Sequence, residues 1–173
     1  ASNGHMITRD GTRTLIAVAA LTGLGTAWSA EKHKVAGTGN FVSMSGRAVG
    51  YSADRPKRDL AQWTAIWSFS STDPDFDGMI ETAPTQSIDG PAIGRHQGLL
   101  TFRHRNGDET RGYFHGTHEV LAKADGTWDM NIDGVKIIVG GTGRFAGAKG
   151  TLRYSAKGAP FGAQFNYSGE VEY

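Results

Sequence analysis

Residues 135–151, VKIIVGGTGRFAGAKGT, are the stretch that decides the fold. We interpret residues 135–139 as a continuous apolar strand, and a second extended run begins at the end of the stretch. Between them, residues 140–150 are rich in glycine, which takes positive φ values and allows strands to approach closely. This segment therefore predicts a tight β-turn with a bulge, in which Phe145 packs over the turn as a plug.

The same glycines invite comparison with a phosphate-binding loop. Such a loop ends in Lys-Ser or Lys-Thr and opens a long helix, whose positive end binds the phosphate. Here Lys149 is followed by Gly150 and by extended sequence instead of a helical pattern. Nucleotide binding is therefore excluded.

Turn signals recur at short spacing along the chain, as is typical of an antiparallel sheet closed into a barrel or folded as a sandwich. Besides residues 135–139, strands are expected at residues 35–51, 62–69, 99–105, 109–121, 127–131, 150–156 and 164–173. Residues 70–94 contain three prolines and are expected to be the longest irregular stretch. About eight strands close into a barrel just wide enough for side chains or one small ligand. We therefore predict an all-β fold, an eight-stranded antiparallel closed β-barrel preceded by an N-terminal signal-type segment.

The composition narrows the functional classes. A chain of 173 residues suits one domain, and its 18 basic and 17 acidic side chains leave a formal charge of +1. This balance creates no global field that would attract nucleic acid or anionic lipid. Cysteine is absent, which excludes disulfides, thiol catalysis and thiolate metal sites.

The N-terminus predicts export. Residues 1–5 are expected to be a vector-derived leader, and residues 6–29 have the parts of a signal peptide: two arginines, an apolar run too short to span a bilayer comfortably, and Ala27-Trp28-Ser29 as a cleavage site. We therefore expect a periplasmic or secreted protein, with a barrel domain at residues 30–173 and no stable membrane span after processing. An ordinary amphipathic first helix is the alternative interpretation.

The glycine-rich string at residues 140–151, between two strands, resembles the allene oxide cyclase barrel and dirigent-like superfamily, here as a bacterial exported member. The resemblance extends from about Gly94 to the C-terminus and includes residues 112–117 and the turn before Thr127-Trp128. It implies an eight-stranded barrel, often trimeric, that isomerises, cyclises or orients hydrophobic small molecules without a metal or organic cofactor. The catalytic residues of that superfamily cannot be matched by motif, so none are transferred.

Polar residues cluster in the central hairpin, where alternation divides them between two faces. One face carries Arg111, Tyr113, His115, Thr117 and Glu119, and the other carries Phe114, Gly116, His118 and Val120. If the first face points inward, a phenol, an imidazole and a carboxylate would line a dry cavity and could move a proton. The candidate catalytic residues are Tyr113, His115 and Glu119, followed by Arg103 and His104. In the alternative interpretation, this face is the wet outer one and Phe114 and Val120 lie in the core.

Large aromatic side chains provide a candidate ligand wall. Trp63, Trp67 and Phe69 alternate with smaller residues and share one face, and Phe102 is a further candidate. Such residues are more often plain core, and only a cavity beside them would indicate a ligand-binding role.

The sequence contains two patterns that resemble metal sites, and neither is expected to bind a metal. A cupin-like barrel would use clustered histidines, but His115 and His118 are three residues apart, which places them on opposite faces of a regular strand. Residues 73–78, DPDFDG, imitate the start of a calcium loop, although the twelfth position holds Pro84 instead of glutamate. A solvated turn is the favoured interpretation of that segment.

Three functions remain open. The leading one is an exported enzyme that performs a cofactor-free isomerisation, cyclisation or elimination on a hydrophobic small molecule held inside the barrel. The second is a periplasmic carrier or dirigent-type barrel that binds such a molecule without catalysis. The third is a structural or adhesive domain whose barrel is filled by side chains. A homotrimer is expected from the resemblance alone.

Overall fold

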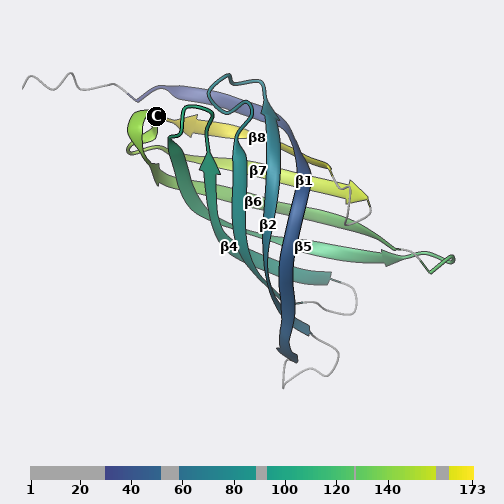
Figure 1. Ribbon diagram of the computed structural model, residues 1–173. Helices are drawn as coiled ribbons and strands as arrows, with labels where there is room; N and C mark the ends of the chain where they lie inside the picture. Colours follow the sequence, from purple (N-terminus) through teal and green to yellow (C-terminus); the bar gives the residue numbers. More distant parts are fainter. Residues whose placement is uncertain (1–29, 52–58, 89–92, 127, 159–163) are drawn as a thin grey trace, which may run out of the picture.

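The computed structural model describes residues 30–51, 59–88, 93–126, 128–158 and 164–173, which form one sheet that closes on itself (Figure 1). The elements are β1 (Lys32–Tyr51), β2 (Asp59–Ser71), β3 (Ile80–Ile88), β4 (Ile93–Arg103), β5 (Glu109–Ala122), β6 (Trp128–Gly141), the short 3-10 helix η1 (Gly143–Phe145), β7 (Lys149–Gly158) and β8 (Gln164–Glu172). Each strand pairs antiparallel with the next, and β8 returns to pair with β1. The predicted eight-stranded antiparallel closed barrel is confirmed. The predicted leader and signal-type segment, residues 1–29, lie outside the described residues.

The predicted number of strands is correct, but some of their predicted positions are wrong. β3 lies within residues 70–94, which were expected to be irregular, and that prediction is wrong. Conversely, the two strands expected at residues 127–131 and 135–139 are parts of the single strand β6. The count of eight therefore combined one missed strand with one strand divided in two.

The composition of β3 explains why it was missed. Its inward residues are Glu81, Ala83, Thr85 and Ser87, so the strand alternates between buried and exposed positions without alternating between apolar and polar residues. Pro84 is exposed and aligned with Thr64 of β2. Proline lacks the N–H that a strand donates, yet a position facing away from the interior can accommodate it.

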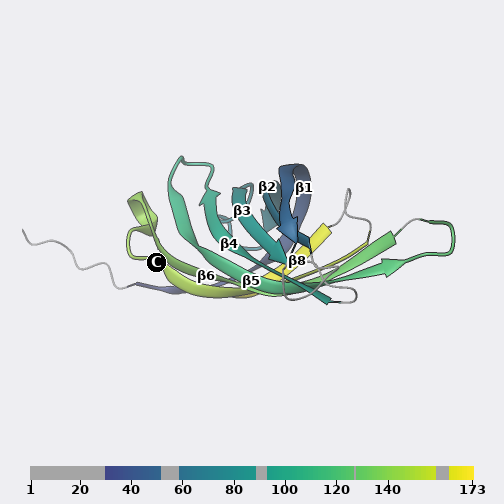
Figure 2. The same ribbon diagram turned by 90° about the horizontal axis from the view of Figure 1, so that it is seen from below.

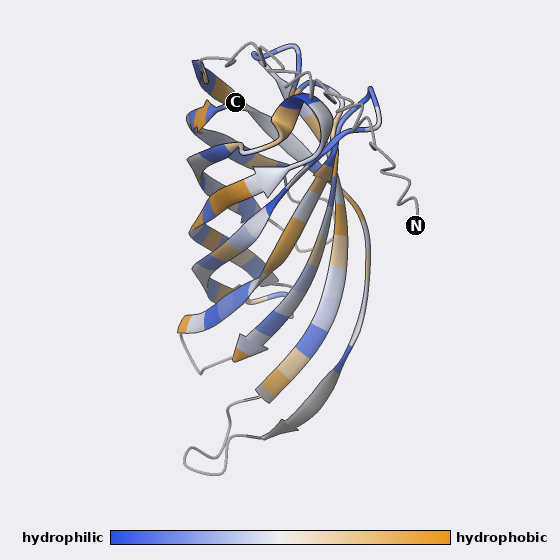
Figure 3. Ribbon diagram, turned by 90° about the vertical axis from the view of Figure 1, so that its left-hand side faces the viewer, coloured by the Kyte–Doolittle hydropathy of each residue, from blue (hydrophilic) through white to orange (hydrophobic). Residues whose placement is uncertain are grey.

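The strands enclose an interior that is packed at one end, here called the plug end, where β1 begins and β8 ends. Figure 1 shows the C-terminus and η1 together at this end, and Figure 2 shows β1 to β4 arching over β5, β6 and β8. The opposite end, here called the far end, holds the connections of β1 to β2, β3 to β4, β5 to β6 and β7 to β8. Bands of opposite hydropathy alternate along the strands, as expected when one face of each strand packs inward (Figure 3).

Phe145 closes the plug end, as the sequence predicted. Its side chain is 0% exposed and stacks on His104, with ring centroids 4.0 Å apart, and it also packs against Phe76 and Tyr173. The chain reaches this position through η1, where Gly143 has a φ of 54°. A left-handed backbone of this kind favours glycine, which accounts for the glycine before the plug. The predicted bulge lies before the turn, in β6. The register between β5 and β6 shifts there, and Val139 is the extra residue of β6.

No helix within the described part of the chain is long and apolar enough to cross a membrane.

Candidate functional site

The barrel contains an interior cavity of about 1510 Å³. One inward residue from each strand borders it: Gly37, Ala61, Ser87, His96, Gly116, Gly134, Tyr154 and Tyr167. From Ala61 on β2 round the barrel to Gly37 on β1, each of these residues is the cross-strand partner of the next. Because all eight strands border it, the cavity is the interior of the barrel and not a groove on its convex surface.

A tyrosine and a histidine meet at the wall of this cavity. The Nε2 atom of His96 on β4 lies 2.6 Å from the hydroxyl oxygen of Tyr154 on β7, and both side chains are buried. Burial, assisted by the negative charges of Glu81 and Asp133, holds the pKa of Tyr154 above that of an ordinary tyrosine. The hydroxyl therefore keeps its proton at neutral pH and is available as a hydrogen-bond donor.

Two glycines make room for this contact. Gly116 and Gly134 face the interior side by side on β5 and β6. A Cβ atom on Gly116 would lie 2.8 Å from the Tyr154 hydroxyl, and one on Gly134 would lie 2.4 Å from it. Any larger residue at these positions would displace the phenol. The Tyr154–His96 contact therefore requires glycine at both positions, and the pair is here called the seat of the contact.

A second histidine extends the contact toward the far end. His118 is buried on the inner face of β5, and its Nδ1 atom lies 3.4 Å from the Nδ1 atom of His96. The prediction that His115 and His118 occupy opposite faces is confirmed, since the side chain of His115 is exposed. Tyr154, His96 and His118 thus form a continuous chain of hydrogen-bonding groups from three strands.

An ion pair lies one inward position nearer the plug end. Lys136 on β6 pairs with the carboxylate of Glu81 on β3, and the ammonium group lies 5.1, 5.3, 5.3 and 5.6 Å from the ring centroids of Phe69, Phe102, Tyr154 and Phe165. Burial lowers the pKa of Lys136, and the Glu81 carboxylate opposes that effect. Because Tyr154 contacts both this ammonium and His96, it connects the ion pair to the wall of the cavity.

The structure places the first three predicted catalytic residues on the outer face. Tyr113 is 44% exposed, the side chain of His115 is also exposed, and Glu119 accepts a hydrogen bond from Asn131 at 3.3 Å. Of the two orientations that the sequence leaves open, the one with this face inward is wrong and the alternative is correct. Phe114 and His118 point into the barrel instead. Val120, expected in the core under that alternative, is exposed as well.

The other two predicted catalytic residues do not face the cavity through their side chains. Arg103 is 71% exposed and pairs with Glu109 at 2.9 Å. His104 belongs to the plug end, where its Nδ1 donates to the carbonyl of Asp75 at 2.9 Å and its Nε2 lies 3.2 Å from Thr110 Oγ1. Burial lowers the pKa of His104, which keeps the ring neutral.

The four residues of the predicted ligand wall all face the interior. Trp67, Phe69 and Phe102 are buried and pack in the hydrophobic core. Trp63 is half-buried and borders a second cavity of about 1060 Å³, together with Thr85 and Phe114. A cavity beside Trp63 is the observation that separates a ligand wall from plain core, so Trp63 retains its candidate role.

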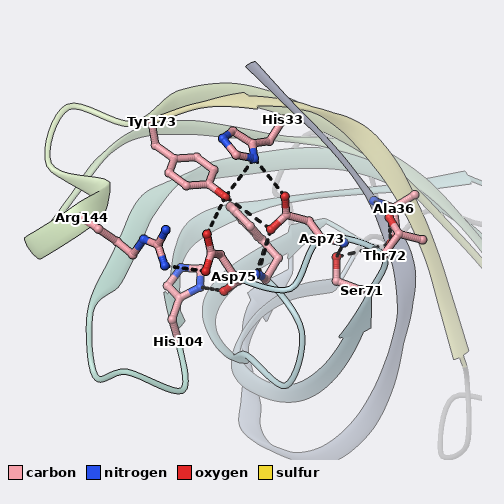
Figure 4. Close-up of polar contacts among 10 residues, drawn as sticks. His33, Ala36, Ser71, Thr72, Asp73, Asp75, His104, Arg144 and Tyr173 are labelled. Atoms are coloured by element: carbon pink, nitrogen blue, oxygen red, sulfur yellow. Dashed lines mark hydrogen bonds and ion pairs between the residues drawn. The ribbon is translucent and has the colours of Figure 1, made fainter. Parts of the chain in front are cut away.

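The aspartates of residues 73–78 are committed to protein contacts (Figure 4). Asp73 accepts the backbone N–H of Asp75 at 2.9 Å, and the Asp75 carboxylate pairs with Arg144 at 2.5 Å. The Tyr173 hydroxyl lies within 3.3 Å of both carboxylates, and burial, followed by their charges, raises its pKa. This geometry is that of a hydrogen-bonded turn, which agrees with the favoured interpretation of the segment.

Metal-ligating side chains do not gather anywhere in the part of the chain that the structure describes. In these segments, no three histidine, cysteine, aspartate or glutamate side chains lie in positions that could hold one metal ion. The phenol and imidazoles described above can transfer protons and donate hydrogen bonds at the cavity.

Comparison of the chain with models of protein families, with curated proteins and with solved structures finds no match. The resemblance to the allene oxide cyclase barrel and dirigent-like superfamily consequently stays a prediction. Arguments about function depend on the cavity and on the residues that border it.

Proposed function

We propose that this protein is a cofactor-free isomerase, cyclase or lyase that acts on a hydrophobic small molecule held inside the barrel. One observation carries the proposal, namely the 2.6 Å contact between Tyr154 and His96 at the wall of the interior cavity. A phenol that keeps its proton beside an imidazole is a suitable hydrogen-bond donor to a substrate oxygen on which negative charge develops.

The geometry suggests how such a reaction would proceed. A substrate oxygen, such as a carbonyl or an epoxide, would accept a hydrogen bond from Tyr154, which stabilises negative charge as it develops there. His96, protonated on Nε2, would donate to the Tyr154 oxygen, which leaves the phenol proton for the substrate oxygen. The interior walls would hold the substrate in a reactive conformation, with Trp63 as an apolar contact.

The volume of the cavity favours binding over a purely structural role. A site of about 1510 Å³ exceeds the roughly 300–1,000 Å³ of most small-molecule pockets. A structural or adhesive barrel would have an interior filled by side chains, and this condition is met only toward the plug end. The carrier hypothesis requires the same cavity without proton transfer, so turnover decides between the two.

A turnover assay on a panel of apolar ketones and epoxides tests the proposal. Cyclohex-3-enone is a suitable first probe, because its conversion to the conjugated cyclohex-2-enone is a pure proton transfer that changes ultraviolet absorbance. Native mass spectrometry of the purified protein would identify a co-purifying compound to add to the panel. We expect Tyr154→Phe to lower turnover by about 100-fold or more, within the range for loss of one hydrogen-bond donor to a developing oxyanion.

Tyr113→Phe is the matched control, because it removes the same hydroxyl from the outer face of β5. It should leave turnover unchanged. Equal turnover by the wild-type protein and Tyr154→Phe would contradict the enzyme proposal. Tight binding across the panel without any turnover would favour the carrier.

Export and trimer formation stay predictions and form part of the same proposal. Sedimentation that shows a monomer at high protein concentration would exclude the homotrimer. Recovery of a chain that begins near Ala30 from the periplasm or the medium would support export and processing.

A further inference from the structure

An apolar patch lies on the outer face of the barrel, across β4, β5 and β6. Leu99 on β4 is aligned with Tyr113 on β5, and Tyr113 is aligned with Ile137 on β6. Leu99 and Tyr113 are 66% and 44% exposed, and Val139, which follows Ile137 on β6, is 61% exposed. Val135 precedes Ile137 on the same strand and is half-buried. These five residues, here called the outer apolar patch, lie on strands that run side by side (Figure 2).

The outer faces of β7 and β8 are polar by contrast. Their outward residues are Lys149, Thr151, Arg153, Ser155 and Lys157 on β7, and Gln164, Asn166, Ser168, Glu170 and Glu172 on β8. Exposed apolar residues that occur singly are common on proteins, whereas a contiguous patch bordered by polar residues marks an interaction surface. A tyrosine near the centre of such a patch is typical of contacts between proteins. The outer apolar patch therefore has the composition of a protein-binding surface.

Charges of opposite sign flank β5 beside the patch. Arg95 on β4 and Asp133 on β6 are both aligned with Thr117 on β5, which lies nearer the far end than Tyr113 does. Both charged side chains are exposed. The same row of the sheet thus carries a positive charge on the β4 side of β5 and a negative charge on the β6 side.

A two-fold axis that runs along β5 would make this surface complementary to itself. Such an axis places β4 of one copy opposite β6 of the other, and each row of the sheet opposite the same row. Arg95 then faces Asp133 of the second copy, and this contact occurs twice because of the symmetry. In the row of Tyr113, Leu99 faces Ile137 of the second copy, so apolar groups meet at the centre and opposite charges meet at the rim.

The charges also disfavour the other simple arrangement. A two-fold axis across the strands, through the row of Leu99, would exchange the two halves of β4. Leu99 lies midway between Arg95 and Arg103, so each arginine would then face the other arginine of the second copy. Like charges in such positions weaken association. With the axis along β5, Arg111 faces its own counterpart, but its charge is matched by Glu109 at 2.6 Å.

We propose that the outer apolar patch is the contact surface of a homodimer whose two-fold axis runs along β5. This inference goes beyond the proposed function and does not depend on it, because the patch lies on the outside of the barrel. The homotrimer expected from the resemblance contains three chains, whereas a two-fold contact makes the number of chains even. Both kinds of contact in one particle would give six chains.

Sedimentation of the full chain over a range of concentrations provides the first test. We expect an even number of chains, and we expect Leu99→Lys to weaken association by about 10-fold or more, because it places a charge within the apolar contact. Val42→Lys is the matched control, since Val42 is 55% exposed on β1, on another side of the barrel. It should associate as the wild-type protein does.

Three results of this test would overturn the proposal. One is a wild-type particle of one or three chains, which would leave the patch to a partner of another kind. The second is equal association of Leu99→Lys and the wild-type protein. The third is equal weakening by Leu99→Lys and Val42→Lys, which would show that an added lysine weakens association wherever it lies.

A charge exchange provides the second test, which is specific for the direction of the axis. Arg95→Glu alone and Asp133→Arg alone each create two like-charge contacts, so each variant should associate about 10-fold more weakly than the wild-type protein. An equimolar mixture of the two variants should form mixed dimers with nearly wild-type affinity, because every introduced charge then faces an opposite one. Both positions are exposed, so unchanged urea midpoints should show that the variants fold. A mixture that associates as weakly as its components would overturn the two-fold arrangement along β5.

Discussion

The ammonium group of Lys136 and the carboxylate of Glu81 form an ion pair across the interior of the barrel. Lys136 belongs to β6 and Glu81 to β3, and two strands separate them in the sheet. Their side chains are 5% and 1% exposed, so neither charge can be solvated by water if its partner is removed. The pair therefore ties opposite walls together at the boundary between the packed plug end and the cavity.

Removal of one partner should strongly destabilise the fold. Lys136→Met leaves the Glu81 carboxylate buried without a counter-ion, which typically costs about 3–5 kcal/mol in the free energy of unfolding. The double variant Lys136→Met with Glu81→Leu should recover most of that loss, because two apolar groups of similar volume replace both charges. Urea denaturation measures the two variants beside the wild-type protein. Equal destabilisation of the single and the double variants would contradict this account.

Replacing the glycine under Tyr154 should disturb both stability and the candidate site. A Cβ on Gly134 would lie 2.4 Å from the Tyr154 hydroxyl and 2.5 Å from the backbone oxygen of His115. We expect Gly134→Ala to cost about 1–3 kcal/mol in the free energy of unfolding, as overpacked interior positions do.

Gly140→Ala is the control for this substitution. Gly140 lies on the same strand, and nothing lies within 4 Å of the position its Cβ would take. Its effect should stay within about 0.5 kcal/mol. If both variants unfold at the same urea concentration, the seat formed by the glycines does not constrain the phenol.

Acid should weaken the plug end through His104. Burial lowers the pKa of His104 below 6.5, so the unfolded chain binds a proton at this residue more readily than the folded chain does. The stability that depends on the neutral ring is present above about pH 6.5 and is lost as the pH falls through the lower folded pKa.

His104→Asn isolates this contribution. An asparagine amide can still donate to the carbonyl of Asp75, but it does not titrate. Between about pH 7.5 and pH 5, the urea midpoint of the wild-type protein should fall further than that of the variant. Parallel curves for the two proteins would show that another group controls acid sensitivity.

Phe145 should contribute more to stability than its exposed neighbours do. Phe145→Ala removes a fully buried ring from the plug and should cost about 3–5 kcal/mol in the free energy of unfolding. Lys149→Ala, which removes an exposed ion pair with Glu172, should cost about 1 kcal/mol or less. Thermal denaturation of both variants provides the comparison, and a small loss for Phe145→Ala would show that the plug can collapse to fill the space.

The alternation of side chains between the two faces of a strand correctly predicted which residues share a face. It separated Phe114 and His118 from Tyr113 and His115 on β5, and it grouped Trp63, Trp67 and Phe69 on one face of β2, as the structure shows. It failed for β3, because a strand whose inward residues are Glu81, Ala83, Thr85 and Ser87 has no apolar period to detect.

The sequence contains features that point to the candidate site, but composition alone does not show which of them matter. Lys136 interrupts an otherwise apolar run, and a lysine in the middle of a buried strand calls for a buried counter-charge. The prediction of a uniformly apolar strand overlooks this lysine, and Glu81 lies 55 positions away in the segment predicted to be irregular. Tyr154 and His96 are similarly remote, 58 positions apart, with no shared motif.

By itself, the sequence determined the all-β class and the plug at Phe145, because strand period and turn chemistry are local properties of the chain. Only the tertiary structure decided which face of β5 lines the interior and which side chains meet there. A strand pattern is unchanged when its two faces are exchanged, and contacts such as Tyr154–His96 and Lys136–Glu81 exist only once the register of every strand around the barrel is set.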